Sequence, residues 1–226
     1  MQVFRSLSLR FQMLLMLVGV VVAGLGLTLA VLMLQATQLQ QAAALRYTQE
    51  LAGRSGDTAA QSLRQALTSA HTLASSLQAL HQGALPGAEK RRLGAAQLRL
   101  VLEQAPQLNG VWSGWEPNAF DGEDAAFAGA PDTDASGRFI PYLSRNGANR
   151  SVVQSVLEGY ETPGEGDYYL KPRASRANTL VEPYSYTFQG RTLMMTSLVA
   201  PILENDRFVG VAGVDLALAD VQQQVQ

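Results

Sequence analysis

The sequence predicts an α+β fold in which a long N-terminal helix leads into an antiparallel sheet with flanking helices. Three observations carry this prediction. An uninterrupted apolar run occupies residues 13–34, and a proline-free stretch rich in Ala, Leu, Gln and Arg follows it to about His81. Beyond the apolar run, Val, Ile, Phe, Tyr and Trp become frequent after Pro106. Good helix formers followed by short β-rich pieces, which Gly, Asn, Asp and Pro separate, are typical of this fold class.

The apolar run at the N-terminus is long enough to cross a membrane. Residues 13–34 carry no charge, and as a helix they would span about 33 Å, against a hydrocarbon core of about 30 Å. Arg5 and Arg10 precede the run, whereas the first charge after it is Arg46. Because a Lys/Arg excess marks the cytoplasmic flank, we expect a cytoplasmic tail at 1–12, a transmembrane helix, and an exported remainder. A cleaved signal peptide is the alternative, although its apolar core is usually only about 7–15 residues long.

The composition narrows the classes of function. The 226 residues include no Cys, 17 Lys and Arg, and 19 Asp and Glu, for a formal net charge of −2. A mildly acidic chain argues against nucleic acid as a partner, and the absence of Cys excludes thiolate metal sites. The segment Asp132-Thr-Asp134-Ala-Ser136-Gly137 copies half of a calcium loop but has Leu143 at position twelve, so we expect no metal. Motifs for hydrolysis or phosphate binding are missing from the sequence, and we expect neither a cofactor nor enzyme activity.

Residues 35–105 predict a stalk helix followed by a second packing helix. An apolar stripe recurs along the stalk at spacings of three and four; its members are Leu63, Leu67, Ala70, Ala74, Leu77 and Leu80. Such a stripe is either an intramolecular packing seam or a coiled-coil interface. A coiled coil, or the small-xxx-small pair Gly19 and Ala23 in the span, would make a homodimer. Pro86 suits the first turn of the second helix, which we expect to run to about Gln104.

The region 106–218 predicts one mixed module. Its expected strands are Gly110–Trp115, Arg138–Leu143, Leu180–Thr187, Thr192–Pro201 and Phe208–Leu216. The turn sequences Gln189-Gly190 and Glu204-Asn205-Asp206 predict that the last three strands form an antiparallel meander. We expect a short helix at Ser151–Glu158, the start of another helix at 219–226, and helices packed against one face of the sheet.

Four segments near the C-terminus resemble the Cache domains of bacterial receptors. They are Gly166-Asp-Tyr-Tyr-Leu, Val181-Glu-Pro-Tyr-Ser-Tyr, Leu193-Met-Met-Thr-Ser-Leu and Gly210-Val-Ala-Gly-Val-Asp215-Leu. Cache domains are extracytoplasmic, PAS-like sensor modules, found most often in methyl-accepting chemotaxis proteins. The resemblance implies the membrane-distal module of a double Cache (dCache) receptor in the bacterial inner membrane, with the module in the periplasm. A second module would follow residues 219–226 and is missing from this chain.

The resemblance also implies a ligand in this module, but the motif for amino acids is incomplete. That subfamily uses an Arg two residues before a Trp-Tyr pair, then Tyr-x-Asp, then a later Asp. Here Gly166 stands at the Arg position before Tyr168-Tyr169, and Tyr184-Ser185-Tyr186 lacks the Asp. Only Asp215 stands where the later Asp is expected. An α-amino acid ligand is thus disfavoured. The output domain would serve chemotaxis or, alternatively, a histidine kinase or diguanylate cyclase; a ligand-free, membrane-anchored interaction domain is a third reading.

Aromatic and acidic side chains of the module suit a small cationic or amine-bearing ligand. Carboxylates among Trp and Tyr faces attract a cation by ion pairing and by cation–π contacts of about 0.5–2 kcal/mol each. The alternative is that the aromatics fill the core and the acids cap turns. Asp215 favours a ligand-binding site, because burial of an acid within the apolar run Val209–Leu218 costs free energy unless the acid has a partner. The predicted ligand-binding residues are Trp112, Trp115, Glu116, Asp167, Tyr169, Tyr184, Tyr186 and Asp215, with Tyr142 and Tyr168 as further aromatics.

Overall fold

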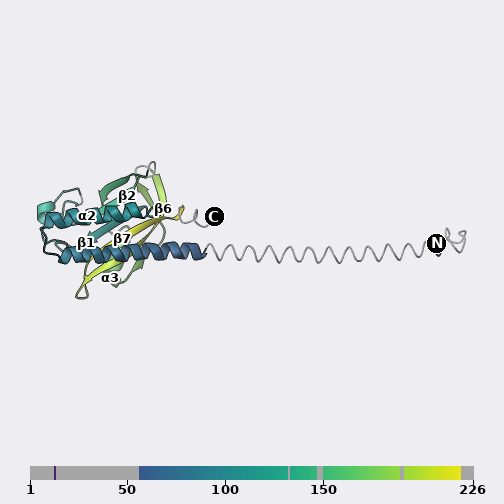
Figure 1. Ribbon diagram of the computed structural model, residues 1–226, viewed down its shortest axis with the longest axis horizontal. Coiled ribbons are helices and arrows are strands. Elements are labelled where there is room, and N and C mark those ends of the chain that lie inside the picture. Colours follow the sequence, from purple (N-terminus) through teal and green to yellow (C-terminus); the bar gives the residue numbers. More distant parts are fainter. Residues whose placement is uncertain (1–12, 14–55, 132, 147–149, 189–190, 220–226) are drawn as a thin grey trace. The chain divides into compact units, whose positions relative to one another are not determined.

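The computed structural model describes residue 13 and residues 56–131, 133–146, 150–188 and 191–219 (Figure 1). Residues 56–219 belong to one compact unit. The predicted membrane span beyond Met13, the part of the predicted stalk before Gly56, the turn Gln189-Gly190 and residues 220–226 lie outside the described residues. Within the described part of the chain, no helix has both the length and the apolar character needed to span a bilayer.

The described elements alternate between helix and strand much as the sequence predicts, with the differences described below. A first helix covers residues 56–82. After it come α2 (Gly87–Gln104), β1 (Gly110–Trp115), the 3-10 helix η2 (Asp124–Phe127), β2 (Pro141–Arg145), β3 (Val152–Val156), α3 (Asp167–Ser175), β4 (Thr179–Leu180), β5 (Tyr184–Phe188), β6 (Arg191–Glu204) and β7 (Arg207–Ala217).

The seven strands form one antiparallel sheet. The strand order is β3-β2-β1-β7-β6-β4, and β5 pairs with β6 beyond the end of β4. One cross-strand row joins Ser144, Gly110, Asp215 and Ser197, and the next joins Tyr142, Trp112, Gly213 and Val199. Because directly opposed residues project on the same face of a sheet, these two rows bring distant parts of the sequence together on one surface.

The first helix and α2 cover one face of the sheet (Figure 1). Ala70, Ala74, Leu77 and Leu80 of the predicted stripe are buried in a core that also contains residues of β1, β6 and β7, and Leu63 and Leu67 pack at its edge. The stripe is therefore an intramolecular packing seam along its described length. The second helix is confirmed as well, since α2 begins directly after Pro86 and ends at Gln104.

The other face of the sheet carries α3 and a second core. Tyr169 and Pro172 are the buried residues of α3, and Tyr169 packs with Trp112, Ile140 and Val211. The expectation that helices cover only one face is therefore wrong. The helix on this face was not predicted because α3 is short, contains a proline and lacks the apolar periodicity that indicates a helix.

The segment Ser151–Glu158 is a strand rather than the predicted helix. Its central residues Val152–Val156 form β3, which pairs along its whole length with β2. Three of these five residues are valine, and β-branched side chains fit a pleated, half-buried surface better than a helix. The serine that suggested a helix cap instead precedes an edge strand.

The remaining strands confirm the predicted meander with shifted boundaries. β1 has the predicted bounds, and β5, β6 and β7 pair antiparallel in succession. The predicted strand Leu180–Thr187 is split into β4 and β5 around Pro183, which lacks the N–H that a strand pair needs. The β6–β7 turn places Asn205 and Asp206 at φ 50° and 61°, the left-handed values that suit a two-residue hairpin.

Candidate functional site

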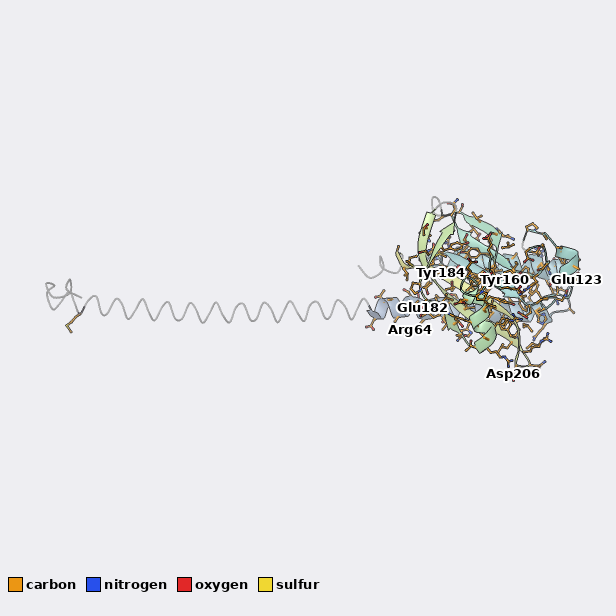
Figure 2. All side chains as sticks on the ribbon, turned by 180° about the vertical axis from the view of Figure 1, so that it is seen from behind. Arg64, Glu123, Tyr160, Glu182, Tyr184 and Asp206 are labelled. Carbon is orange, nitrogen blue, oxygen red and sulfur yellow. The ribbon has the colours of Figure 1, made fainter. Side chains whose placement is uncertain are left out.

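A cavity of about 560 Å³ lies over the face of the sheet that carries α3. This volume is within the range of about 300–1,000 Å³ that small-molecule sites occupy. Its floor consists of Trp112, Tyr142, Ser197 and Asp215 from four neighbouring strands. Two walls rise from this floor. One is the segment 156–171, and the other is the edge segment 181–186, in which Glu182 and Tyr184 are labelled in Figure 2.

Asp215 is the carboxylate at the centre of the floor. It is only 2 % exposed, and its Oδ1 accepts hydrogen bonds from Trp112 Nε1 at 2.9 Å and Ser197 Oγ at 2.7 Å. Ser197 Oγ lies 2.9 Å from the hydroxyl of Tyr184. Because the single Ser197 proton is used on Asp215, the Tyr184 hydroxyl donates to Ser197. A chain of hydrogen bonds thus runs from the β5 wall to the buried carboxylate.

Burial dominates the electrostatics of the floor. It raises the pKa of Asp215, against the opposing effect of hydrogen bonds from Trp112, Ser197 and Tyr142. Burial, with the nearby Asp215 charge, also raises the pKa of the Tyr142, Tyr168 and Tyr184 hydroxyls, so these groups stay neutral. An ionised Asp215 in this place lacks a cationic partner among the described residues that line the cavity floor. A nearby positive charge would stabilise an ionised carboxylate in such a place.

Aromatic rings surround this carboxylate. Trp112 and Tyr168 meet edge to face with centroids 5.0 Å apart, and Tyr142 and Tyr186 do so at 6.0 Å. Such edge-to-face pairs fix the orientation of the rings through their quadrupoles. The rings come from β1, β2, α3 and β5, so all four elements must be correctly placed for the rings to surround Asp215.

The wall 156–171 brings further acids to the cavity. Glu158, Glu165 and Asp167 line it from this segment, and Glu182 does so from the opposite wall. Lys171 lines the cavity as well, but its Nζ lies 3.0 Å from Asp167 Oδ2 in an ion pair one helical turn away. The described lining therefore carries five carboxylates and one ammonium group.

The cavity brings together five of the eight predicted site residues, which are Trp112, Asp167, Tyr184, Tyr186 and Asp215. Trp115 lies elsewhere. It is fully buried in the core under the first helix, where its ring lies 5.4 Å from His81 and its Nε1 donates to Ser113 Oγ. The reason is the period of two along a strand, because Trp112 and Trp115 are three residues apart on β1 and face opposite sides.

Glu116 and Tyr169 lie together beside the cavity, outside its lining. The Tyr169 hydroxyl donates to Glu116 Oε1 and accepts from Arg138 Nη2, and Glu116 Oε2 pairs with Arg173 at 3.0 Å. Arg138 also donates to the carbonyl of Trp115 and to Glu161, and its guanidinium stacks on Tyr160. This network attaches α3 and the wall 156–171 to β1, so these two predicted residues position the cavity wall.

Several lining residues were missed by sequence reasoning. Ser197 is the most informative, because β6–β7 pairing places it directly opposite Asp215. The hairpin turn at Asn205-Asp206 alone would not have located it, because the register of the two strands shifts between Ile202 and Leu203 and counting from the turn places Val214 opposite Ser197. Glu158, Glu165, Lys171 and Glu182 carry no comparable signal, because each lies in an irregular or short segment. Among the described residues there is no group of three or more His, Asp or Glu side chains placed to hold a metal.

A single antiparallel sheet with helices on both faces and a cavity on one of them defines a PAS-like, α+β sensor domain. The family model described as "Methyl-accepting chemotaxis protein-like, first PDC sensor domain" matches residues 98–223, which is more than half of the chain. The chain belongs to this family. The match agrees with the Cache resemblance of the sequence.

Two relatives illustrate how far the similarity extends. The methyl-accepting chemotaxis protein TlpQ of Pseudomonas aeruginosa is 28% identical over 136 residues, which are 56% of this chain and 19% of TlpQ. The extracellular domain of mmHK1S-Z3, whose parent protein is classed as a histidine kinase, has 31% identity and a TM-score of 0.64. That comparison covers 79% of this chain and 61% of the other chain. The chain thus spans about a fifth of the curated relative and about three fifths of the solved domain.

A third comparison concerns the fold alone. The ligand-binding domain of the Pseudomonas aeruginosa amino acid chemoreceptor PctC, solved in complex with GABA, has 17% identity and a TM-score of 0.50. It covers 80% of this chain and 67% of the PctC domain. The shared architecture extends well beyond the range in which the sequences are similar.

Proposed function

We propose that this chain carries the extracytoplasmic sensor of a chemoreceptor and that its cavity binds a small cationic, amine-bearing molecule. The observation that carries the proposal is the buried carboxylate of Asp215 on an aromatic floor. A ligand ammonium group placed there would gain an ion pair in a poorly solvated site together with cation–π contacts to the surrounding rings. The excess of carboxylates on the walls supports the same charge preference.

An α-amino acid fits the cavity less well. The position that carries Arg in amino acid receptors is Gly166, where a Cβ would lie 2.5 Å from the carbonyl oxygens of Gly159 and Tyr160. Substitution here by Arg would require the backbone to move. Lys171 is the one cationic side chain in the described lining, and Asp167 already neutralises it. A ligand carboxylate would therefore meet mainly negative charge.

The N-terminal sequence supports a membrane setting, and the similarity to TlpQ supports a role in chemotaxis. The apolar run at 13–34 and the arginines before it support an inner-membrane protein whose sensor domain lies in the periplasm. TlpQ is a methyl-accepting chemotaxis protein, which supports the assignment of this chain to chemotactic signalling. We also propose a homodimer, on the basis of the small-xxx-small pair Gly19 and Ala23 in the apolar run. The match to mmHK1S-Z3 supports one second candidate, in which the same domain controls a histidine kinase. The two candidates share the cavity and its ligand.

A thermal-shift screen of the full chain in detergent tests the ligand class. The library should contain molecules of matched shape and different charge, such as benzylamine, benzyl alcohol and benzoate, with aliphatic amines and their carboxylic acid counterparts. A ligand that binds only the native state stabilises it by about 2.7 kcal/mol at a hundredfold excess over Kd. We expect the hits to be amines. Hits confined to anions would contradict the proposed charge preference, and a complete lack of hits would contradict the sensor assignment.

A further inference from the structure

Trp112 lies against β7 at a place where that strand has no side chain. Gly213 is directly opposite Trp112 in the β1–β7 pair. A Cβ built on Gly213 would lie 2.1 Å from Cζ2, 2.3 Å from Cε2 and 2.6 Å from Cη2 of the indole. The ring therefore occupies the space that the first side-chain atom of any other residue would need.

The position of this ring decides two features of the cavity floor. The indole Nε1 donates to Asp215 Oδ1 at 2.9 Å, and the ring edge meets Tyr168 of α3 at a centroid distance of 5.0 Å. Trp112 is 2 % exposed and packs directly on Gly213, so a small rotation of the indole cannot make room for a methyl group beneath it. A side chain on residue 213 would lift the indole into the cavity and separate Nε1 from the carboxylate.

A second glycine has the same relation to the other side of Asp215. A Cβ on Gly110 would lie 2.4 Å from Asp215 Oδ2 and 2.9 Å from the Tyr142 hydroxyl. Gly110 and Asp215 are themselves directly opposed in the β1–β7 pair. The carboxylate, the indole and the phenol thus lie directly over the backbone of these two glycines. The local backbone conformation does not require glycine at either position, because neither residue has a positive φ.

We infer that Gly213, with Gly110, is a positioning residue of the cavity: it determines the depth of the floor and aligns Trp112 with Asp215 for recognition of a cation. This inference rests on the proposed function for its ligand, while the alignment itself is a property of the unliganded protein. An alanine at either position would fill part of the cavity with the displaced ring. It would also leave the Asp215 carboxylate without one of its donors.

The test compares Gly213→Ala with Gly114→Ala in the full chain in detergent. Gly114 is a matched control, because it lies on β1, on the same face, and its Cβ would approach only side-chain carbons, at 3.2 Å or more. The protein contains two tryptophans, so ¹⁵N-labelled indole gives two NMR signals, and Trp112→Phe identifies the one from Trp112. We expect Gly213→Ala to shift the Trp112 signal and to speed its hydrogen exchange at least tenfold, and Gly114→Ala to leave both unchanged.

Ligand affinity and a double substitution complete the test. With benzylamine as probe, Gly213→Ala should weaken binding at least tenfold, and Gly114→Ala less than twofold. The fall in melting temperature caused by Gly213→Ala should be smaller in a Trp112→Ala background, because the clash is then gone. An unchanged indole signal, or an equal fall in both backgrounds, would overturn the inference. If wild-type protein fails to bind benzylamine or any other amine, the proposed function fails, whereas the indole signal and the double substitution still decide the role of Gly213.

Discussion

Asp215 combines nearly complete burial with hydrogen bonds from Trp112 and Ser197, and its charge can be removed with little change of shape. We expect Asp215→Asn to retain the fold, because an amide is isosteric with a carboxylate and less costly to bury. Amine binding should weaken by about 2–5 kcal/mol, the usual effect of breaking a buried charged pair. Calorimetry on both proteins measures this. Asp167→Asn at the cavity rim is the control and should have a smaller effect. Unfolding of Asp215→Asn with affinity retained would make Asp215 a structural acid.

The raised pKa of Asp215 predicts a particular pH dependence of stability. Burial raises the folded-state pKa above the ordinary value of 3.8, so the folded protein holds a proton that the unfolded chain has released. The associated stability is complete below about pH 4 and is lost as the pH rises through the folded-state pKa. Denaturant unfolding of wild type and Asp215→Asn should therefore show a stability difference in favour of Asn that grows from pH 4 toward pH 7. A constant difference would contradict the raised pKa.

For single residues, the alternation along a strand and the pairing between strands explain which site residues could be predicted from the sequence. Trp112 and Asp215 could be predicted because a large aromatic and an acid stood inside apolar strands. Trp115 was assigned to the same site although the alternation along a strand already places it on the opposite face. The contact between Trp112 and Gly213 could not be found, because it depends on the β1–β7 register, and these strands are about a hundred residues apart in the sequence.

Among the elements, α2 and the segment 117–137 are joined by one buried cation. Arg91 is 3 % exposed and donates to Asp121 and to Asp124, while its guanidinium lies over the ring of Phe127. Burial raises the pKa of Asp121, but the Arg91 hydrogen bond and charge outweigh this effect and lower it overall. The pair thus stabilises the fold above the ordinary pKa of Asp121 and loses that contribution as the pH falls.

Removal of the Arg91 side chain should lower the stability of the fold far more than removal of the neighbouring Arg92 side chain. We expect Arg91→Ala to lower the free energy of unfolding by about 3–5 kcal/mol, because two acids would be left without their buried partner. Arg92→Ala is the matched control, since Arg92 pairs only with Glu89 on the exposed side of α2 and should change stability little. Urea denaturation of both variants distinguishes the two. Equal effects would show that the Arg91 cluster is not the link between α2 and the segment 117–137.

The success of prediction differed between elements for physical reasons. The first helix and α2 were predicted well because their periodicity or turn signals extend over many residues. β3 and α3 were not, because each is shorter than ten residues and depends on tertiary contacts, β3 on pairing with β2 and α3 on the Tyr169 network. Short segments of this kind carry too few residues for propensity to decide.

For the molecule as a whole, the packing of the first helix predicts where a second subunit can contact it. Its apolar stripe is occupied by the sheet, so a partner must use the opposite, exposed side, which includes Arg64, Thr68, His71 and Ser75. Since the chain contains no Cys, single cysteines at these positions can crosslink only between subunits. We expect crosslinks there, and none at the buried positions Leu73 and Leu77.

The same cysteines test whether the helix transmits a signal. A ligand shifts an equilibrium only through different affinities for two arrangements, so the crosslink pattern should change when an amine binds. An amine that binds without any change in the pattern would argue against the first helix as the transmitting element. Failure to crosslink at every exposed position would argue against a homodimer formed through the described part of the helix.

The floor of the cavity is built from strands, whereas one of its two walls is a connecting segment, and this difference has a consequence for how such proteins diversify. The floor residues alternate along β1 and β7 with residues of the helix-side core, so a change of strand register would disturb both layers at once. The wall 156–171 is one continuous stretch whose acids Glu158, Glu165 and Asp167 are not in that core. Selection can therefore exchange the chemistry of the wall by substitution or insertion while inheriting the floor intact. New ligand preferences in this lineage should arise first in the wall.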